Sequence, residues 1–100
     1  MSLNIETKID ESTVISLAGR LDTTTAPILE EELDKVLSSA KNLIFDLEKL
    51  EYISSAGLRV ILKAQKSIGR GGTLRLIHVN KSVKEVFDIT GFSDFLTIEG

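Results

Sequence analysis

The first residues of the chain alternate between apolar and polar side chains, which is the pattern of a strand with one buried face. Leu3, Ile5 and Ile9 are the apolar members of the first run, and Thr13–Ala18 forms a second run. Between the two runs, Asp10–Ser12 has the composition of a turn. These residues predict a β-hairpin at the start of the fold.

Three later segments place apolar residues at helical spacing. The first helix is expected to begin at a cap on Thr24 or Thr25, and its apolar stripe consists of Leu29, Leu33, Val36 and Leu37. The second follows the two serines at 54 and 55 and stops at Gly69–Gly72. The third is expected from the capping-box pattern Ser82–Glu85, with Gly91 ending it.

Three more runs predict strands. Asn42–Leu47 is nearly continuous in apolar residues, as in a central strand covered on both faces, and Thr73–Val79 and Phe95–Ile98 follow it. The order strand, strand, helix, strand, helix, strand, helix, strand predicts one α/β domain over residues 1–100. Its mixed β-sheet begins with the hairpin and continues with alternating helices and parallel strands joined by right-handed crossovers.

Composition and charge exclude several kinds of binding site and partner. The chain has no cysteine, which excludes disulfides and thiolate metal sites, and its single histidine, His78, has no companions in the sequence that would complete a metal site. We therefore expect no metal and no cofactor. The net charge of −3 argues against direct nucleic-acid binding. No apolar run approaches the roughly 18–20 residues of a membrane span, so we expect no membrane partner and a cytoplasmic location.

Tyr52–Leu62 is the least generic stretch. Two serines, an alanine and a glycine stand there between an apolar approach and an amphipathic run. Ser54 is the expected N-cap, because a serine oxygen can accept from the unpaired N–H groups of a first turn. The hydroxyl of Ser55 should then be exposed on a rigid element. Helix capping and regulation are the two interpretations, since a nucleophilic serine needs a base and His78 lies alone in another segment.

Asp22 and Asp46 are the next candidates, because both are expected near strand ends. They are either loop residues with local hydrogen bonds or residues that frame the site of Ser55. Asp46 also suggests the phosphoacceptor of a receiver domain. That interpretation is disfavoured because Leu17–Gly19 ends the earlier strand without the acidic pair that receiver domains carry.

A basic stripe runs along the second predicted helix, formed by Arg59, Lys63, Lys66 and Arg70. It is either a solvated helix face or a docking surface for an acidic partner. Gly69–Gly72 superficially suggests a phosphate-binding loop. Such loops lead from a strand into a helix, whereas this segment leads from a helix into a strand, so we interpret it as a helix stop.

Taken together, these segments resemble the STAS domain family of anti-sigma factor antagonists. The signature-like segment is Tyr-Ile-Ser-Ser-Ala-Gly-Leu-Arg-Val-Ile-Leu at 52–62, and supporting matches lie at 19–22, 42–48 and 83–92, in the correct order over essentially the whole chain. The family signature reads Asp-Ser, a small residue, then Gly-Leu, and its serine is the phosphoacceptor. By position that serine is Ser55. Ser54 stands where the aspartate is common and remains a competing acceptor.

The resemblance implies a bacterial transcription regulator that acts by partner switching and is not an enzyme. Unphosphorylated, it would bind an anti-sigma factor that is also a serine kinase, and so release the sigma factor. Phosphorylation would break that complex, and a metal-dependent serine/threonine phosphatase would restore it. The implied partner-binding residues are Asp22, Thr23, Ser54, Ser55, Ala56, Gly57, Leu58 and Arg59. We expect a monomer or weak dimer.

Two alternatives remain open. One is a STAS interaction module in another signalling, secretion-regulating or transport assembly. The other is a small enzyme or nucleotide-binding protein, which is disfavoured because the sequence shows neither a catalytic pair nor a phosphate-binding loop.

Overall fold

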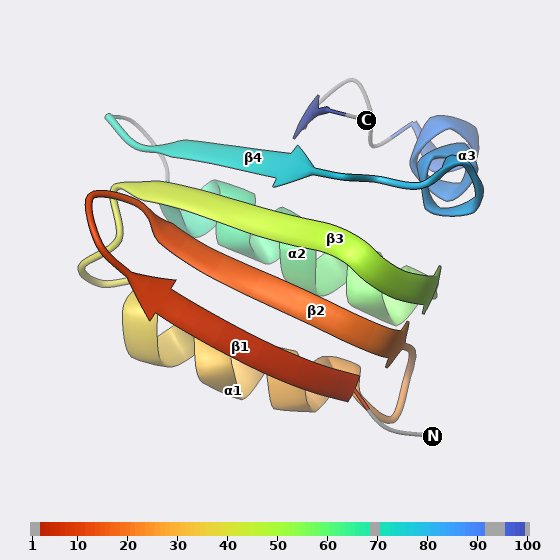
Figure 1. Ribbon diagram of the computed structural model, residues 1–100, viewed down its shortest axis with the longest axis horizontal. Helices are drawn as coiled ribbons and strands as arrows, with labels where there is room; N and C mark the ends of the chain where they lie inside the picture. The colour runs from red at the N-terminus through yellow and green to blue at the C-terminus, as the bar shows by residue number, and fades with distance from the viewer. Residues whose placement is uncertain (1–2, 69–70, 92–95, 100) are drawn as a thin grey trace.

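A computed structural model describes residues 3–68, 71–91 and 96–99, and within these ranges five strands form one sheet in the order β1-β2-β3-β4-β5 (Figure 1). The strands are β1 (Leu3–Ile9), β2 (Thr13–Leu21), β3 (Asn42–Ile53), β4 (Thr73–Ile77) and β5 (Thr97–Ile98). The helices are α1 (Ala26–Val36), α2 (Ser55–Ile68) and α3 (Lys81–Thr90). No helix in the described ranges is long and apolar enough to cross a bilayer.

The predicted α/β architecture is confirmed. β1 and β2 form the antiparallel hairpin, while β2, β3, β4 and β5 pair in parallel, each with the next. Each parallel connection contains one helix. Since every crossover advances in the same direction along the sheet, right-handed connections place the helices on one side of it. Figure 1 shows α1 and α2 on the far face of the sheet and α3 beside the end of β4.

The opposite face of the sheet is open, which corrects the expectation that Asn42–Leu47 is covered on both faces. Leu43, Phe45 and Leu47 are fully buried, whereas Ile44 and Asp46 between them are only half-buried. The apolar run looked continuous because the open face carries an isoleucine at 44. The burial itself alternates with the period of two that a one-sided strand requires.

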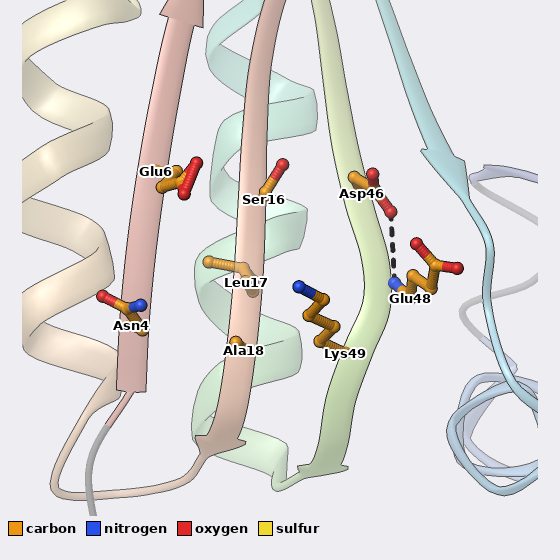
Figure 2. A pocket seen from close by; sticks show the side chains of 8 residues that line it. All are labelled: Asn4, Glu6, Ser16, Leu17, Ala18, Asp46, Glu48 and Lys49. Carbon is orange, nitrogen blue, oxygen red and sulfur yellow. Dashed lines mark hydrogen bonds between the residues drawn. The ribbon is translucent and has the colours of Figure 1, made fainter.

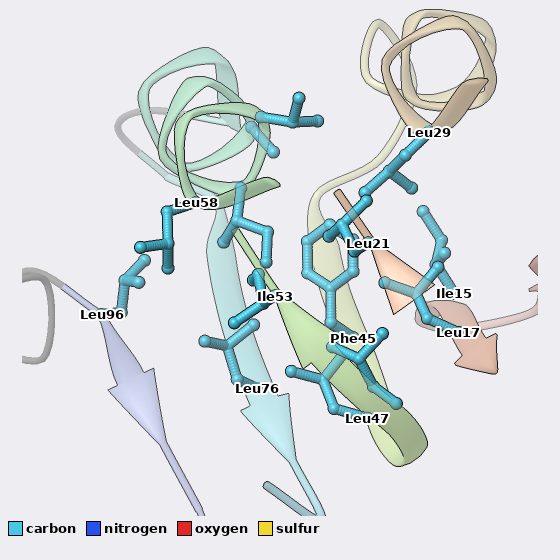
Figure 3. Close-up of a cluster of buried hydrophobic side chains, with 14 of the residues drawn as sticks. Ile15, Leu17, Leu21, Leu29, Phe45, Leu47, Ile53, Leu58, Leu76 and Leu96 are labelled. Carbon is cyan, nitrogen blue, oxygen red and sulfur yellow. The ribbon is translucent and has the colours of Figure 1, made fainter. Parts of the chain in front are cut away.

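The core lies between the sheet and its helices, and Figure 3 shows the side chains that meet there. Phe45 is at its centre, and Leu21 and Leu58 pack around it from β2 and α2. The predicted stripe of α1 is confirmed at Leu29 and its buried neighbours, with Leu37 only partly buried. Of the aromatic residues near the end of the chain, Phe92 and Phe95 lie outside the described residues.

Two strands are longer than predicted. β2 continues past Ala18 to Leu21, and β3 continues past Leu47 to Ile53. The register between them shifts at two points, between Ser16 and Ala18 and between Gly19 and Arg20. Such irregularities break strict alternation, which hides the strand continuation from a period-two pattern. The consequence is that β2 and β3 end side by side.

The capping chemistry at two helix starts differs from the prediction. α3 begins one residue before Ser82 because Asn80 is its N-cap: the Asn80 Oδ1 accepts from the Val83 N–H at 2.9 Å, and the Nδ2 donates to the Leu50 carbonyl at 2.8 Å. At α1, Thr25 occupies the N-cap position, but its hydroxyl makes no capping bond. Gly91 ends α3 at φ 80°, as predicted.

Candidate functional site

The carboxyl ends of β2 and β3 define one edge of the molecule. Leu21 and Ile53 are partners in the parallel register, and the Ser54 N–H donates to the Leu21 carbonyl at 2.9 Å. The loop after β2 and the start of α2 are therefore fixed next to each other. We call this region the strand-end edge, formed by residues 20–25 and 52–59.

The two serines occupy the positions that the sequence predicts. α2 begins at Ser55, and the Ser54 Oγ accepts a long hydrogen bond, 3.4 Å, from the Gly57 N–H. Ser54 is half-buried and Ser55 is exposed. The structure confirms the capping position of Ser54 and the exposed position of Ser55, and the functional roles of both serines stay predictions.

Two of the predicted partner-binding residues face inward. Leu58 is 1 % exposed, and Gly57 is buried against β2 and β3. A Cβ placed on Gly57 would lie 2.6 Å from the Cγ of Leu21 and 3.0 Å from a side-chain carbon of Ile53. These two residues seat α2 on the strand ends, and neither belongs to the exposed surface of the edge.

Asp22 organises the loop between β2 and α1. Its Oδ1 accepts from the Thr24 hydroxyl at 2.7 Å, the Thr24 N–H at 2.9 Å and the Thr25 N–H at 3.2 Å. The Thr24 hydroxyl is the largest cause that lowers the pKa of Asp22, the backbone N–H bonds act in the same direction, and desolvation opposes them. The interpretation of Asp22 as a loop residue with local hydrogen bonds is confirmed, and the same bonds place it at the strand-end edge.

Thr25 connects that loop to β2. Its buried hydroxyl donates to the Arg20 carbonyl at 2.8 Å and accepts from the Asp22 N–H at 2.8 Å. A threonine that satisfies two backbone groups in this way holds the loop rather than the helix end. Thr23, in contrast, is exposed at the tip of the loop.

Sequence reasoning missed a stacked pair at the same edge. The Arg20 guanidinium carbon lies 4.3 Å from the ring centroid of Tyr52, which is 41 % exposed. The two residues are register partners on β2 and β3. Each lies in a segment that the sequence singled out, but only the strand pairing shows that they meet. An exposed aromatic ring held by an arginine is a common component of protein interfaces.

A shallow groove of about 300 Å³ runs between α1 and α2 next to the strand-end edge. It is lined by Thr23, Ala26, Pro27, Glu30, Ala56, Arg59, Val60 and Lys63. The Lys63 ammonium pairs with the Glu30 carboxylate across the two helices, and this hydrogen bond raises the pKa of Lys63. The predicted basic stripe therefore includes one paired cation. Arg59 is exposed at the wall of the groove, and Arg70 lies outside the described residues.

Asp46 does not frame Ser55, contrary to one of the two interpretations. It lies inside β3, seven residues before Ile53, which is roughly 20 Å along a strand. It pairs instead with His78, whose Nδ1 is 2.9 Å from the Asp46 Oδ1. That hydrogen bond raises the pKa of His78. The expectation that His78 lacks companions is wrong, because strand pairing brings Asp46 and Glu48 to it.

Comparisons with known proteins find relatives in both sequence and fold. The model of the STAS domain family matches residues 4–100. The anti-sigma-B factor antagonist of Bacillus subtilis (strain 168) is 31 % identical over 100 residues, which span 98 % of this chain and 92 % of that protein.

Two solved structures share the fold. The crystal structure of an anti-sigma factor antagonist from Mycobacterium paratuberculosis superposes with a TM-score of 0.91 at 23 % identity, over 98 % of this chain and 86 % of that one. The Bacillus cell fate determinant SpoIIAA, in its phosphorylated form, superposes with a TM-score of 0.73 at 19 % identity, over 97 % of this chain and 90 % of that one.

Proposed function

The chain belongs to the STAS domain family, and from this membership we propose that it is an anti-sigma factor antagonist switched by phosphorylation of Ser55. In this proposal the unphosphorylated protein binds an anti-sigma factor that is also a serine kinase. Binding releases the sigma factor, and phosphate transfer to Ser55 ends the complex. The protein is thus a binder and a substrate, and not the catalyst.

The observation that carries the proposal is the exposure of Ser55, the first residue of α2. A kinase needs an accessible hydroxyl, and the preceding Ser54 is held at the cap and half-buried. Accessibility therefore separates the two serines and favours Ser55 as the acceptor.

The electrostatics of the strand-end edge tolerate a phosphate. A phosphoserine adds roughly −1.5 to −2 charges at neutral pH, and the N-terminus of a helix stabilises negative charge. Arg59 is four residues further on the same helix and exposed, at the spacing where side chains of a helix approach each other. The phosphorylated form of SpoIIAA has this fold, which supports a local effect of phosphate without unfolding.

The effect on a partner is expected to be large. The exposed residues of the edge are Thr23, Thr24, Tyr52, Ser55 and Arg59, and the half-buried residues beside them are Arg20, Asp22, Ser54 and Ala56. A partner that packs on this small surface would meet a new dianion at its centre. Each ~1.4 kcal/mol of binding free energy lost there weakens the complex tenfold.

The test combines a kinase assay with phosphopeptide mapping. Incubation with the cognate kinase and ATP should add one phosphate to the wild-type chain and to Ser54→Ala, and none to Ser55→Ala. In the absence of ATP, the phosphorylated chain should bind the kinase at least about tenfold more weakly than the unphosphorylated chain does. Mapping of the phosphate to Ser54, or unchanged phosphorylation of Ser55→Ala, would refute the assignment. Recovery of transporter or secretion subunits in place of a kinase would favour the alternative STAS assembly.

The phosphatase completes the cycle. Treatment of the phosphorylated chain with a metal-dependent serine/threonine phosphatase should restore partner binding to the level of the unmodified chain. Ser55→Asp offers a second readout, because it introduces a permanent negative charge at the same position. Wild-type affinity in Ser55→Asp and in the phosphorylated chain would overturn the electrostatic part of the proposal.

A further inference from the structure

The open face of the sheet carries a second cluster of functional side chains, away from the strand-end edge. A groove of about 200 Å³ lies between β1, β2 and β3, and its lining includes Asp46 and Glu48 of β3 (Figure 2). His78 joins them from the residue after β4. One ligand atom from each of Asp46, Glu48 and His78 lies within 4.8 Å of the others.

These distances suit a small divalent ion with little rearrangement. Zinc bonds to imidazole nitrogen and carboxylate oxygen are about 2.0–2.2 Å, so tetrahedral ligands stand about 3.4 Å apart. To reach that spacing, the Asp46 Oδ1 and the His78 Nδ1, now 2.9 Å apart, would move apart by about half an ångström. The most distant pair of ligand atoms, at most 4.8 Å apart, would move together by up to about 1.4 Å. Rotation of exposed side chains supplies movements of this size.

The pairing of β3 with β4 fixes the positions of the three ligands. Asp46 is the register partner of Ile77, the last residue of β4, which sets His78 directly beside the carboxylate. The Glu48 N–H donates to the Asp46 Oδ1 at 3.1 Å and orients it. His78 has φ 55°, the one positive φ of a non-glycine residue among those that the structure describes. This left-handed conformation turns the chain where the imidazole meets the two carboxylates.

We propose that Asp46, Glu48 and His78 bind a divalent transition-metal ion of the Zn²⁺ class. One imidazole nitrogen and two carboxylate oxygens match the mixed nitrogen and oxygen preference of Zn²⁺, whereas Ca²⁺ and Mg²⁺ favour oxygen ligands alone. Two carboxylates balance the charge of a dication. Three protein ligands leave a fourth coordination position for water, as in an open zinc site.

The bound ion connects β3 to the segment between β4 and α3. Because binding to the folded state stabilises it, the melting temperature rises with the concentration of the ion. This site lies roughly 20 Å along β3 from Ser55, so its occupancy is measured separately from the phosphorylation switch. Lys49 of β3 also lines the groove (Figure 2).

Calorimetric titration of the untagged, metal-free chain with Zn²⁺ tests the proposal. We expect one Zn²⁺ per chain, with a matching change in the ring signals of the single histidine by nuclear magnetic resonance. Asp46→Asn, Glu48→Gln and His78→Asn should each weaken binding at least about tenfold, since even the loss of an outer-shell partner has effects of that size. Asparagine at 78 retains tolerance for a positive φ.

The matched control is Glu51→Gln, which removes an exposed carboxylate of the same strand outside the cluster and should leave Zn²⁺ affinity within about twofold of the wild type. Circular dichroism verifies that each variant folds; if His78→Asn does not, the two carboxylate variants decide. Absence of saturable binding, binding that survives all three substitutions, or Mg²⁺ binding as tight as Zn²⁺ would each overturn the proposal.

Discussion

Asp22 shows how a single carboxylate shapes a functional edge. Its Oδ1 accepts hydrogen bonds from the Thr24 hydroxyl and from the N–H groups of Thr24 and Thr25, and these donors favour the ionised form of the carboxyl. Its pKa is therefore lowered from the model-peptide value of 3.8, chiefly by the Thr24 hydroxyl. For a carboxyl with a lowered pKa, the stabilising contribution is present above 3.8 and disappears as the pH falls through the folded-state pKa.

The Thr24→Val substitution isolates that hydroxyl. We expect the pKa of Asp22 to rise towards 3.8, so that the loop loses its order at a higher pH than in the wild type. The change in the pKa is measured from the carboxyl-carbon resonances of Asp22, followed from about pH 2 to about pH 6, a range that brackets the unperturbed carboxyl pKa. Thr23→Val, in the same exposed loop, is the control. An equal shift in both variants would show that the Thr24 hydroxyl is not the cause.

Residues with local roles were predictable, whereas residues that meet through strand pairing were not. Helix-start chemistry is contained in a few consecutive residues, so Ser54 as the cap and Ser55 as an exposed hydroxyl could be inferred from the sequence. Asp46 and His78 are 32 residues apart in sequence, and their contact depends on the register of β3 and β4. The same reason hid the Arg20–Tyr52 stack.

At the scale of elements, α2 is positioned by the absence of a side chain at Gly57. Its backbone approaches Leu21 and Ile53 so closely that a methyl group would lie 2.6–3.0 Å from their carbons. Both of those side chains are buried and have little room to move. The height of the helix above the strand ends, and with it the position of Ser55, depends on this contact.

Gly57→Ala puts two effects in competition. Alanine favours a helix interior by ~1 kcal/mol over glycine, whereas overpacking of a buried contact costs ~1–3 kcal/mol. Because the two contacts to Leu21 fall below 3.0 Å, we expect the overpacking to prevail, with a net loss of up to ~2 kcal/mol in the free energy of unfolding, measured in urea. Ser67→Ala, in the exposed last turn of α2, should change it by less than ~0.5 kcal/mol. A stabilised Gly57→Ala would show that α2 shifts freely over the strands.

Element boundaries were the less predictable part of the fold. The elements and their order followed from periodicity, since Leu29 and its stripe or the alternation of Leu3 and Ile5 carry the signal locally. The ends of β2 and β3 did not, because register shifts interrupt the alternation before Leu21 and Ile53. At α3, both Asn80 and Ser82 are residue types that cap helices. Asn80 is the cap in the structure, and its side chain also donates to the Leu50 carbonyl of β3.

For the whole molecule, the principal asymmetry is that the helices cover only one face of the sheet. Apolar residues of β3 therefore contribute unequally to the free energy of unfolding, because Leu47 is fully buried in the core whereas Ile44 is half-buried on the open face. Nearly continuous apolar residues concealed this difference in the sequence. Only the direction of the crossovers, which is a property of the complete topology, resolves it.

Substitution on the two faces measures the asymmetry directly. Leu47→Ala should lower the free energy of unfolding by ~2–5 kcal/mol, because it leaves a cavity in the core. Ile44→Thr keeps a β-branched side chain on the open face and should cost less than ~1 kcal/mol. Denaturant titration of the two variants gives both values. Similar losses in the two variants would mean that the open face is covered in solution.

The position of Tyr52 gives the molecule a built-in optical reporter. The chain has one tyrosine and no tryptophan, so its near-ultraviolet emission comes from a single ring stacked on Arg20 at the strand-end edge. The single histidine, which follows β4, contacts Asp46, and Asp46 is roughly 20 Å from Tyr52 along β3. Fluorescence therefore follows events at the strand-end edge, and imidazole resonances follow events at the open face, in the same unlabelled sample.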